Sequence, residues 1–144
     1  MRSFHVVKIL KVEDPRRCIG CMLCSQACAR LYGDFSVFRA AIHVHTTGGM
    51  PEEFIITSCR ACLNPSCREA CPCDALKARE GGGVVFLKES CSACGACLQG
   101  CPIGAIRADE DNHPIICRHC GYCAKYCPHN CIILKEIQSD QPQD

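Results

Sequence analysis

Closely spaced cysteines are the residues in this chain that could do chemistry. Eighteen of the 144 residues are cysteine, and sixteen of them fall into four runs. In chain order these are Cys18, Cys21, Cys24 and Cys28 (run one); Cys59, Cys62, Cys67 and Cys71 (run two); Cys91, Cys94, Cys97 and Cys101 (run three); and Cys117, Cys120, Cys123 and Cys127 (run four). Such density predicts either a disulfide scaffold or a metal centre.

The N-terminal sequence argues against a disulfide scaffold. Disulfides belong to oxidising compartments, but MRSFHVVKILKVEDPRRC does not read as an export signal. Lys8 and Lys11 interrupt its apolar run, and it lacks a small-residue cleavage site. No stretch approaches the roughly 20 apolar residues of a membrane span. We therefore expect a cytoplasmic, reducing setting, in which clustered cysteines bind metal.

The spacing fits [4Fe–4S] clusters better than zinc. Runs one, three and four read C-x2-C-x2-C-x3-C, and run two reads C-x2-C-x4-C-x3-C. The first three sulfurs of such a run bind one cube, and the fourth, followed by proline in runs two to four, binds the other cube of a pair. Zinc sites use separated cysteine pairs around one ion. The sequence therefore predicts four [4Fe–4S] clusters, and a zinc-binding interaction module is the weaker alternative.

Two cysteines lie outside the runs, Cys73 and Cys131. The simpler interpretation is a small buried residue near a cluster, and the alternative is ligand exchange or redox sensing. No motif suggests catalysis. Gly81-Gly82-Gly83 reads as a turn and not as a nucleotide-binding loop. Fully cysteine-ligated cubes also leave no iron open to substrate.

Histidines and basic residues near the runs carry weaker signals. His119 and His129 could tune a cluster through hydrogen bonds to sulfur, but surface or packing roles are simpler. His43 and His45 share one face of a predicted strand, so we expect them to be exposed or to face a partner. Basic residues beside the runs could offset cluster charge or be solvated: Arg16, Arg17, Arg60, Arg68, Arg118 and Lys125.

The stretches between the runs predict short elements. A short helix, a glycine turn and a strand should connect run two to run three. Residues 39–58 should form a hairpin closed by the turn Gly48-Gly49-Met50-Pro51, and the terminal strands should pair, followed by a frayed SDQPQD tail. The expected strands are Val6–Val12, Ala41–Thr46, Phe54–Thr57, Val84–Leu87 and Ile132–Ile137.

Four runs require two cluster pairs, and two pairings are open. Neighbouring runs could pair, or runs two and three could pair inside runs one and four. The nineteen residues between Cys71 and Cys91 match the usual inter-motif length of a two-cluster ferredoxin and favour nesting. We therefore expect an α+β fold of two bacterial-ferredoxin-like modules around four cubane clusters. The inner module spans 59–110, and the outer module spans 1–58 plus 111–144.

Nesting assigns four cysteines to each cluster. The outer module would hold cluster 1 with Cys18, Cys21, Cys24 and Cys127, and cluster 2 with Cys117, Cys120, Cys123 and Cys28. The inner module would hold cluster 3 with Cys59, Cys62, Cys67 and Cys101, and cluster 4 with Cys91, Cys94, Cys97 and Cys71.

The four runs, with Asn-Pro before the third cysteine of run two, resemble the four-cluster iron–sulfur subunits of dimethyl-sulfoxide-reductase-type, formate dehydrogenase and hydrogenase complexes. The resemblance covers residues 18–128, and nested pairing is the rule in that family. AAIHVHTTGGMPEEFIITSCRACLNPSC and HPIICRHCGYCAKYCPHNC are similar to the small ferredoxin subunit of tungsten enzymes of the aldehyde:ferredoxin oxidoreductase family, which includes aldehyde oxidoreductases and class II benzoyl-CoA reductase. One departure is Ala29, which stands after Cys28 in place of proline and leaves the local turn open.

The resemblance implies a non-catalytic electron-transfer subunit of an anaerobic oxidoreductase. It would relay single electrons between a large tungsten- or molybdenum-pterin catalytic subunit and an external carrier or a further NAD- or ferredoxin-linked subunit. The alternatives are a free polyferredoxin, or the iron–sulfur subunit of a hydrogenase or carbon monoxide dehydrogenase. The net charge of +1 argues against nucleic acid as a partner. No membrane partner is expected, and an assembly of several copies stays open.

Overall fold

The α-helices of this protein are short, and each begins within one cysteine run. The computed structural model describes residues 6–46 and 54–138. Each α-helix carries the third cysteine of its run, and those of runs two, three and four end directly before the fourth cysteine, because the x3 gap leaves room for only about one turn. Within the described residues, no helix is long and apolar enough to cross a membrane. The α-helices are α1 (Leu23–Leu31), α2 (Ser66–Ala70), α3 (Ala96–Gly100) and α4 (Tyr122–Tyr126).

Strands occur in antiparallel pairs between and around the runs. Within the described residues they form two-stranded sheets only. The pairs are β1 (Val6–Val12) with β8 (Ile132–Gln138), β2 (His43–Thr46) with β3 (Phe54–Thr57), β4 (Leu76–Ala78) with β5 (Val84–Phe86), and β6 (Arg107–Ala108) with β7 (Pro114–Ile115). The fold is therefore α+β, with elements too short to bury a large apolar core of their own.

Most expected strands are confirmed, and one expected element is wrong. β1 pairs with β8 along its length, from Val6 opposite Gln138 to Val12 opposite Ile132, and β2 pairs with β3 as a hairpin. The short helix expected after run two is instead strand β4, because Leu76 and Val84 are buried together across the β4–β5 hairpin. The β6–β7 hairpin was not expected. The predicted turn at residues 48–51 and the predicted frayed tail lie outside the described residues.

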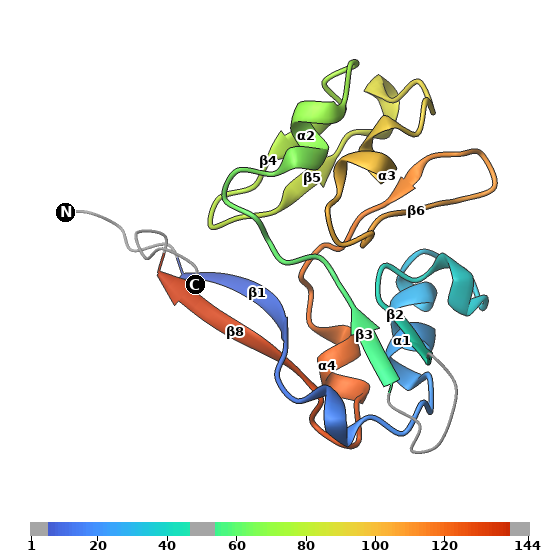
Figure 1. Cartoon of the computed structure of the whole chain (residues 1–144), viewed down its shortest axis with the longest axis vertical. Coiled ribbons are helices and arrows are strands. Elements are labelled where there is room, and N and C mark those ends of the chain that lie inside the picture. Colours follow the sequence, from blue (N-terminus) through green and yellow to red (C-terminus); the bar gives the residue numbers. More distant parts are fainter. Residues whose placement is uncertain (1–5, 47–53, 139–144) are drawn as a thin grey trace.

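The helices pair between distant runs. α1 packs against α4, and α2 packs against α3. In Figure 1, α2 and α3 lie in the upper part of the molecule with β4 and β5, while α1 and α4 lie in the lower part with β2 and β3. Gly100 permits the close approach of α2 and α3, since a Cβ there would lie 2.6 Å from the Ala70 Cβ. Runs one and four, and runs two and three, therefore lie side by side.

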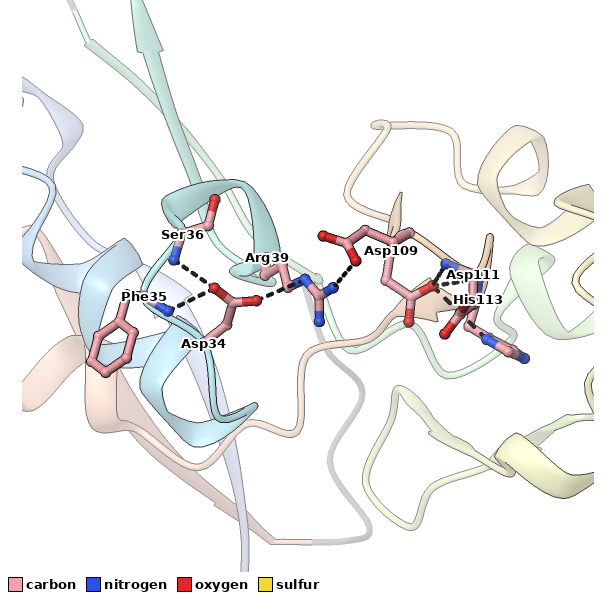
Figure 2. A network of polar contacts seen from close by, with 8 residues as sticks. Asp34, Phe35, Ser36, Arg39, Asp109, Asp111 and His113 are labelled. Atoms are coloured by element: carbon pink, nitrogen blue, oxygen red, sulfur yellow. Dashed lines mark hydrogen bonds and ion pairs between the residues drawn. The ribbon is translucent and has the colours of Figure 1, made fainter.

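A polar network joins the loop after α1 to the β6–β7 hairpin (Figure 2). The Arg39 guanidinium pairs with the Asp34 carboxylate at 2.8 Å and with the Glu110 carboxylate at 3.0 Å. The Asp109 carboxylate accepts the backbone N–H groups of Asp111 and His113 at 3.0 and 2.8 Å, which fixes the hairpin turn. Partly exposed ion pairs stabilise weakly, so this network orients the loop more than it holds the fold.

The expectation that His43 is exposed or faces a partner is wrong. His43 is buried, with 4% of its surface exposed, and its Nε2 lies 3.3 Å from the Ala105 carbonyl oxygen. Burial lowers its pKa to about 4, so the ring packs as a neutral group. Two residues of one strand face differ here because β2 begins at His43, whose ring meets the Ala105 segment, whereas His45 is exposed as expected.

The β6–β7 hairpin lies across the predicted module boundary. β6 (Arg107–Ala108) precedes residue 110, and its partner β7 (Pro114–Ile115) follows it. The division at residue 110 therefore stays a prediction, with a hairpin spanning it.

Candidate iron–sulfur centres

The backbone of each run curls around its first cysteine. The residue before the second cysteine has a positive φ in every run: Gly20 (73°), Ala61 (53°), Ala93 (58°) and His119 (54°). This turn points backbone N–H groups at sulfur. Ala93 and His119 donate to the Sγ atoms of Cys91 and Cys117 at 3.3 and 3.4 Å. Consecutive N–H groups in such a turn form a concavity that suits an anionic sulfur.

A second turn follows the last cysteine of runs two, three and four. Its third residue again has a positive φ, at Asp74 (55°), Gly104 (64°) and Asn130 (53°). The fourth residue then donates its N–H back to the cysteine sulfur. These bonds run from Ala75 to Cys71 at 3.4 Å, from Ala105 to Cys101 at 3.3 Å, and from Cys131 to Cys127 at 3.4 Å.

Run one replaces this turn with a longer helix. Ala29 continues α1 to Leu31, and it is fully buried. The Sγ of Cys28 receives its N–H bond from Ala41 instead, at 3.2 Å, thirteen residues along the chain. Without the proline, the N–H donor to the Cys28 sulfur comes from a different segment, but the sulfur still accepts one backbone hydrogen bond.

Three cavities each gather sulfurs from two runs. Cys18, Cys21, Cys24 and Cys127 line the first together with Cys131. Cys117, Cys120, Cys123 and Cys28 line the second, and Cys91, Cys94, Cys97 and Cys71 line the third together with Cys73. Among the run cysteines of each cavity, three come from one run and the fourth is the last cysteine of another.

The remaining four cysteines also lie near one another. Electrostatic interaction couples Cys59 to Cys62 and Cys101, and it couples Cys67 to Cys59 and Cys101. Cys117 interacts with Cys59 as well as with Cys28. The group around Cys59 therefore lies next to the cavity around Cys117.

Burial makes these thiolates costly without a cation. The second cysteine of each run, Cys21, Cys62, Cys94 or Cys120, is exposed, while the third is buried in runs one, three and four. Burial raises the pKa of Cys117 to about 12 and that of Cys67 to about 11. Ferric and ferrous iron bind thiolate and supply the compensating charge. The donor set, all sulfur with backbone N–H support, fits iron–sulfur clusters.

None of the eighteen cysteines forms a disulfide. This agrees with the expectation of a metal scaffold. Arg16 and Arg17 are 87% and 62% exposed and pair with Asp14, which supports the solvated interpretation for these two arginines.

Tyr32 is a site residue that sequence reasoning missed. It lines the cavity of Cys28, Cys117, Cys120 and Cys123, and its hydroxyl donates to the Ile116 carbonyl oxygen at 2.6 Å. Burial raises its pKa to about 12, and the Arg118 guanidinium lies 5.0 Å from its ring centroid. Tyr32 therefore closes this cavity with a neutral side chain. Its place beyond the end of run one gave no signal in the sequence.

His119 packs between the two pairs of runs. It is 3% exposed, and its Nδ1 accepts the Leu10 N–H of β1 at 3.0 Å. A Cβ on Gly83 would lie 3.3 Å from its Nε2, and the Gly83 N–H donates to the Cys62 carbonyl oxygen at 3.0 Å. The packing interpretation is confirmed for His119. The ring links β1 and run four to the glycine turn beside run two.

Comparison with known families decides between iron–sulfur clusters and zinc. The description "4Fe-4S dicluster domain" applies to two family matches, one over residues 51–124, about half of the chain, and one over residues 10–72. The chain belongs to the 4Fe-4S dicluster domain family. With sixteen cysteines in cluster-binding spacing, this dicluster protein binds four [4Fe–4S] clusters. The zinc interpretation is therefore wrong.

Several relatives of this dicluster protein are named as subunits of reductases or of a dehydrogenase. It is 39% identical to a tetrathionate reductase subunit of Archaeoglobus fulgidus over 65% of this chain and 45% of the relative. It is 31% identical to a chain of the anaerobic dimethyl sulfoxide reductase of Escherichia coli K12 over 74% of this chain and 58% of the relative. It is 32% identical to the beta subunit of the NADH-dependent phenylglyoxylate dehydrogenase of Aromatoleum evansii over 83% of this chain and 28% of the relative. The chain thus matches between about a quarter and three fifths of these relatives' lengths.

Introducing the missing proline should damage run one. Ala29→Pro places a ring inside α1, where it removes a backbone donor and clashes with the preceding turn, so we expect a loss of about 3 kcal/mol or more in unfolding free energy. Pro102→Ala, at the equivalent position of run three, should cost no more than about 1 kcal/mol. Anaerobic denaturant unfolding of the cluster-loaded protein measures both. Equal stability of Ala29→Pro and the parent would contradict the helical role of Ala29.

Proposed function

We propose that this chain is an electron-transfer subunit that relays single electrons through four [4Fe–4S] clusters. The observation that carries the proposal is the gathering of cysteines into cavities that each take the last sulfur from another run. A bound [4Fe–4S] cluster accepts and releases one electron with little change in structure. The chain is proposed to hold and tune these centres, and the catalysis is proposed to occur on a partner.

The cavities support nested ligand sets. We assign Cys18, Cys21, Cys24 and Cys127 to cluster 1, and Cys117, Cys120, Cys123 and Cys28 to cluster 2. We assign Cys59, Cys62, Cys67 and Cys101 to cluster 3, and Cys91, Cys94, Cys97 and Cys71 to cluster 4. The packing of α1 on α4 and of α2 on α3 supports the same pairs, since each exchanged cysteine lies in one of these helices or directly after it. Residues 59–110 would then form the inner module, and the flanking segments the outer one.

The contacts also suggest an order for the clusters. Clusters 3 and 4 would share runs two and three, whose helices α2 and α3 pack together, and clusters 1 and 2 would share runs one and four, whose helices α1 and α4 pack together. Cys117 of cluster 2 is the sulfur that lies near Cys59 of cluster 3. The proposed path therefore runs 4, 3, 2, 1, with the buried His119, two residues after Cys117, near its middle step. The exposed second cysteine of each run gives each cluster an edge toward the surface.

The proposed partner is a large tungsten- or molybdenum-pterin oxidoreductase subunit in the cytoplasm. The stretches AAIHVHTTGGMPEEFIITSCRACLNPSC and HPIICRHCGYCAKYCPHNC support a tungsten enzyme of the aldehyde:ferredoxin oxidoreductase type. The relatives named as reductase and dehydrogenase subunits support a catalytic partner in general. A further NAD- or ferredoxin-linked subunit would complete the path. The second candidate is a free polyferredoxin or a hydrogenase or carbon monoxide dehydrogenase subunit.

Double substitutions should reveal the nested ligand sets. If Cys18 and Cys127 bind the same cluster, Cys18→Ser with Cys127→Ser should lose about as much iron as either single change, since only one centre is damaged. Cys18→Ser with Cys71→Ser should damage two centres and lose about twice as much. Iron and acid-labile sulfide of the anaerobically purified protein measure both outcomes.

The reverse pattern would contradict nesting. If runs one and two shared clusters, the Cys18 and Cys71 double variant would lose the iron of one centre, and the Cys18 and Cys127 variant that of two. The unchanged protein, with about sixteen irons per chain, is the reference for both.

Anaerobic purification of the tagged protein from its native host tests the partner. We expect tungsten, or molybdenum, to co-purify with a large second subunit, because a pterin enzyme needs a route for its electrons. Metal analysis and mass determination of the eluted complex give the result. Nickel in place of tungsten would favour the hydrogenase or carbon monoxide dehydrogenase alternative, and elution of the iron-loaded chain alone would contradict the proposed partner.

A further inference from the structure

Cys131 occupies a position that three of the four runs share. It is the fourth residue after the last cysteine of run four, as Ala75 and Ala105 are after runs two and three. All three residues are buried, with 1%, 1% and 4% of their surfaces exposed for Cys131, Ala75 and Ala105. Each donates its backbone N–H to the preceding ligand sulfur at 3.3 to 3.4 Å. The backbone therefore makes the same hydrogen bond to sulfur in all three runs, and only the side chain at this position differs.

The Cys131 side chain adds a contact that alanine cannot make. Its thiol lines the cavity of Cys18, Cys21, Cys24 and Cys127, and its own backbone N–H already lies 3.4 Å from the Cys127 sulfur, which places the thiol beside that ligand. Ala75 lines the cavity of Cys71, Cys91, Cys94 and Cys97, where its methyl group has no proton to offer. Since Cys131 is 1% exposed, water does not compete for the thiol.

We propose that Cys131 is a positioning residue that raises the reduction potential of cluster 1 by donating an S–H hydrogen bond to Cys127. The proposal rests on the ligand sets proposed above. Reduction adds one electron and one negative charge to the centre, and a hydrogen bond to a ligand sulfur stabilises the more negative state. The thiol keeps its proton in both states, so no bond breaks and no proton moves. Cluster 1 thereby differs from clusters 3 and 4, whose equivalent positions carry alanine.

Ligand exchange is the competing role for the Cys131 thiol. Its cavity already contains four sulfurs from the two runs that nesting joins, so a fifth is surplus to a four-cysteine cube. The second cysteine outside the runs, Cys73, also lines a cavity of four run cysteines, that of Cys71, Cys91, Cys94 and Cys97, but its thiol has another partner. The half-buried Cys73 donates its thiol to the Ser92 hydroxyl at 3.1 Å. Cys73 thus provides a matched control with the same chemistry and another hydrogen-bond partner.

Potentiometric titration followed by electron paramagnetic resonance tests the proposal, with dithionite as reductant. Cys131→Ala copies the side chain found at positions 75 and 105, so it should fold and keep its iron. We expect one transition to shift to more negative potential. The ratio of reduced to oxidised cluster should fall roughly two- to tenfold at fixed potential, which for one electron is at most about 59 mV. Cys131→Ser keeps a donor and should restore most of the shift.

The shifted transition must belong to cluster 1. It should be the transition that Cys18→Ser removes or alters, and Cys73→Ala should leave it in place. Cys131→Ala that keeps its iron without any shift would overturn the proposal, as would a shift that Cys131→Ser does not reverse. Loss of about four irons in Cys131→Ala would assign Cys131 as a ligand instead. Four transitions and about sixteen irons in the unchanged protein test the proposed function separately, whatever Cys131 does.

Discussion

Buried thiolate needs positive charge, and the structure of this protein depends on meeting that need. The third cysteines of runs one, three and four are buried, and burial alone favours their protonated form. Backbone N–H groups supply part of the compensation, and clusters supply the rest. Left-handed residues such as Ala61 and Ala93 are costly for an ordinary side chain, yet the chain adopts them to aim these N–H groups. Since the same cysteines fill much of the core, folding and cluster insertion should be inseparable.

Short elements follow from this arrangement. A helix that starts at the third cysteine of a run must end before the fourth turns to another cavity, unless a different segment supplies the donor. Run one shows the exception, since α1 continues past Cys28 and Ala41 provides the N–H. The strands lie between the cysteine runs and at the two ends of the described chain, where they connect the cluster sites. The β1–β8 pair joins the two ends of the described chain and brings Leu10 to His119, which in turn packs on the turn beside run two.

The sequence predicted what local spacing controls. The four runs, the four clusters and the β1–β8 and β2–β3 pairs followed from cysteine spacing and strand patterns. What it could not predict depends on contacts between distant segments. His43 is buried because the Ala105 segment covers it, and Tyr32 closes a cavity because its hydroxyl meets Ile116, 84 residues along the chain. The segment after run two became a strand because Leu76 pairs opposite Phe86. The equivalence of Cys131 with Ala75 and Ala105 was readable from the spacing, but its contact with Cys127 required the fold.

The most direct test of the account is the position of the iron. Diffraction from anaerobically grown crystals, collected at the iron absorption edge, locates each cluster through its anomalous signal and shows which sulfurs bind it. We predict four cubes in the order 4, 3, 2, 1, with Cys127 on the cube of run one and Cys28 on the cube of run four. A cube that joins Cys18, Cys21 and Cys24 to Cys71, or fewer than four cubes in a fully loaded protein, would contradict it.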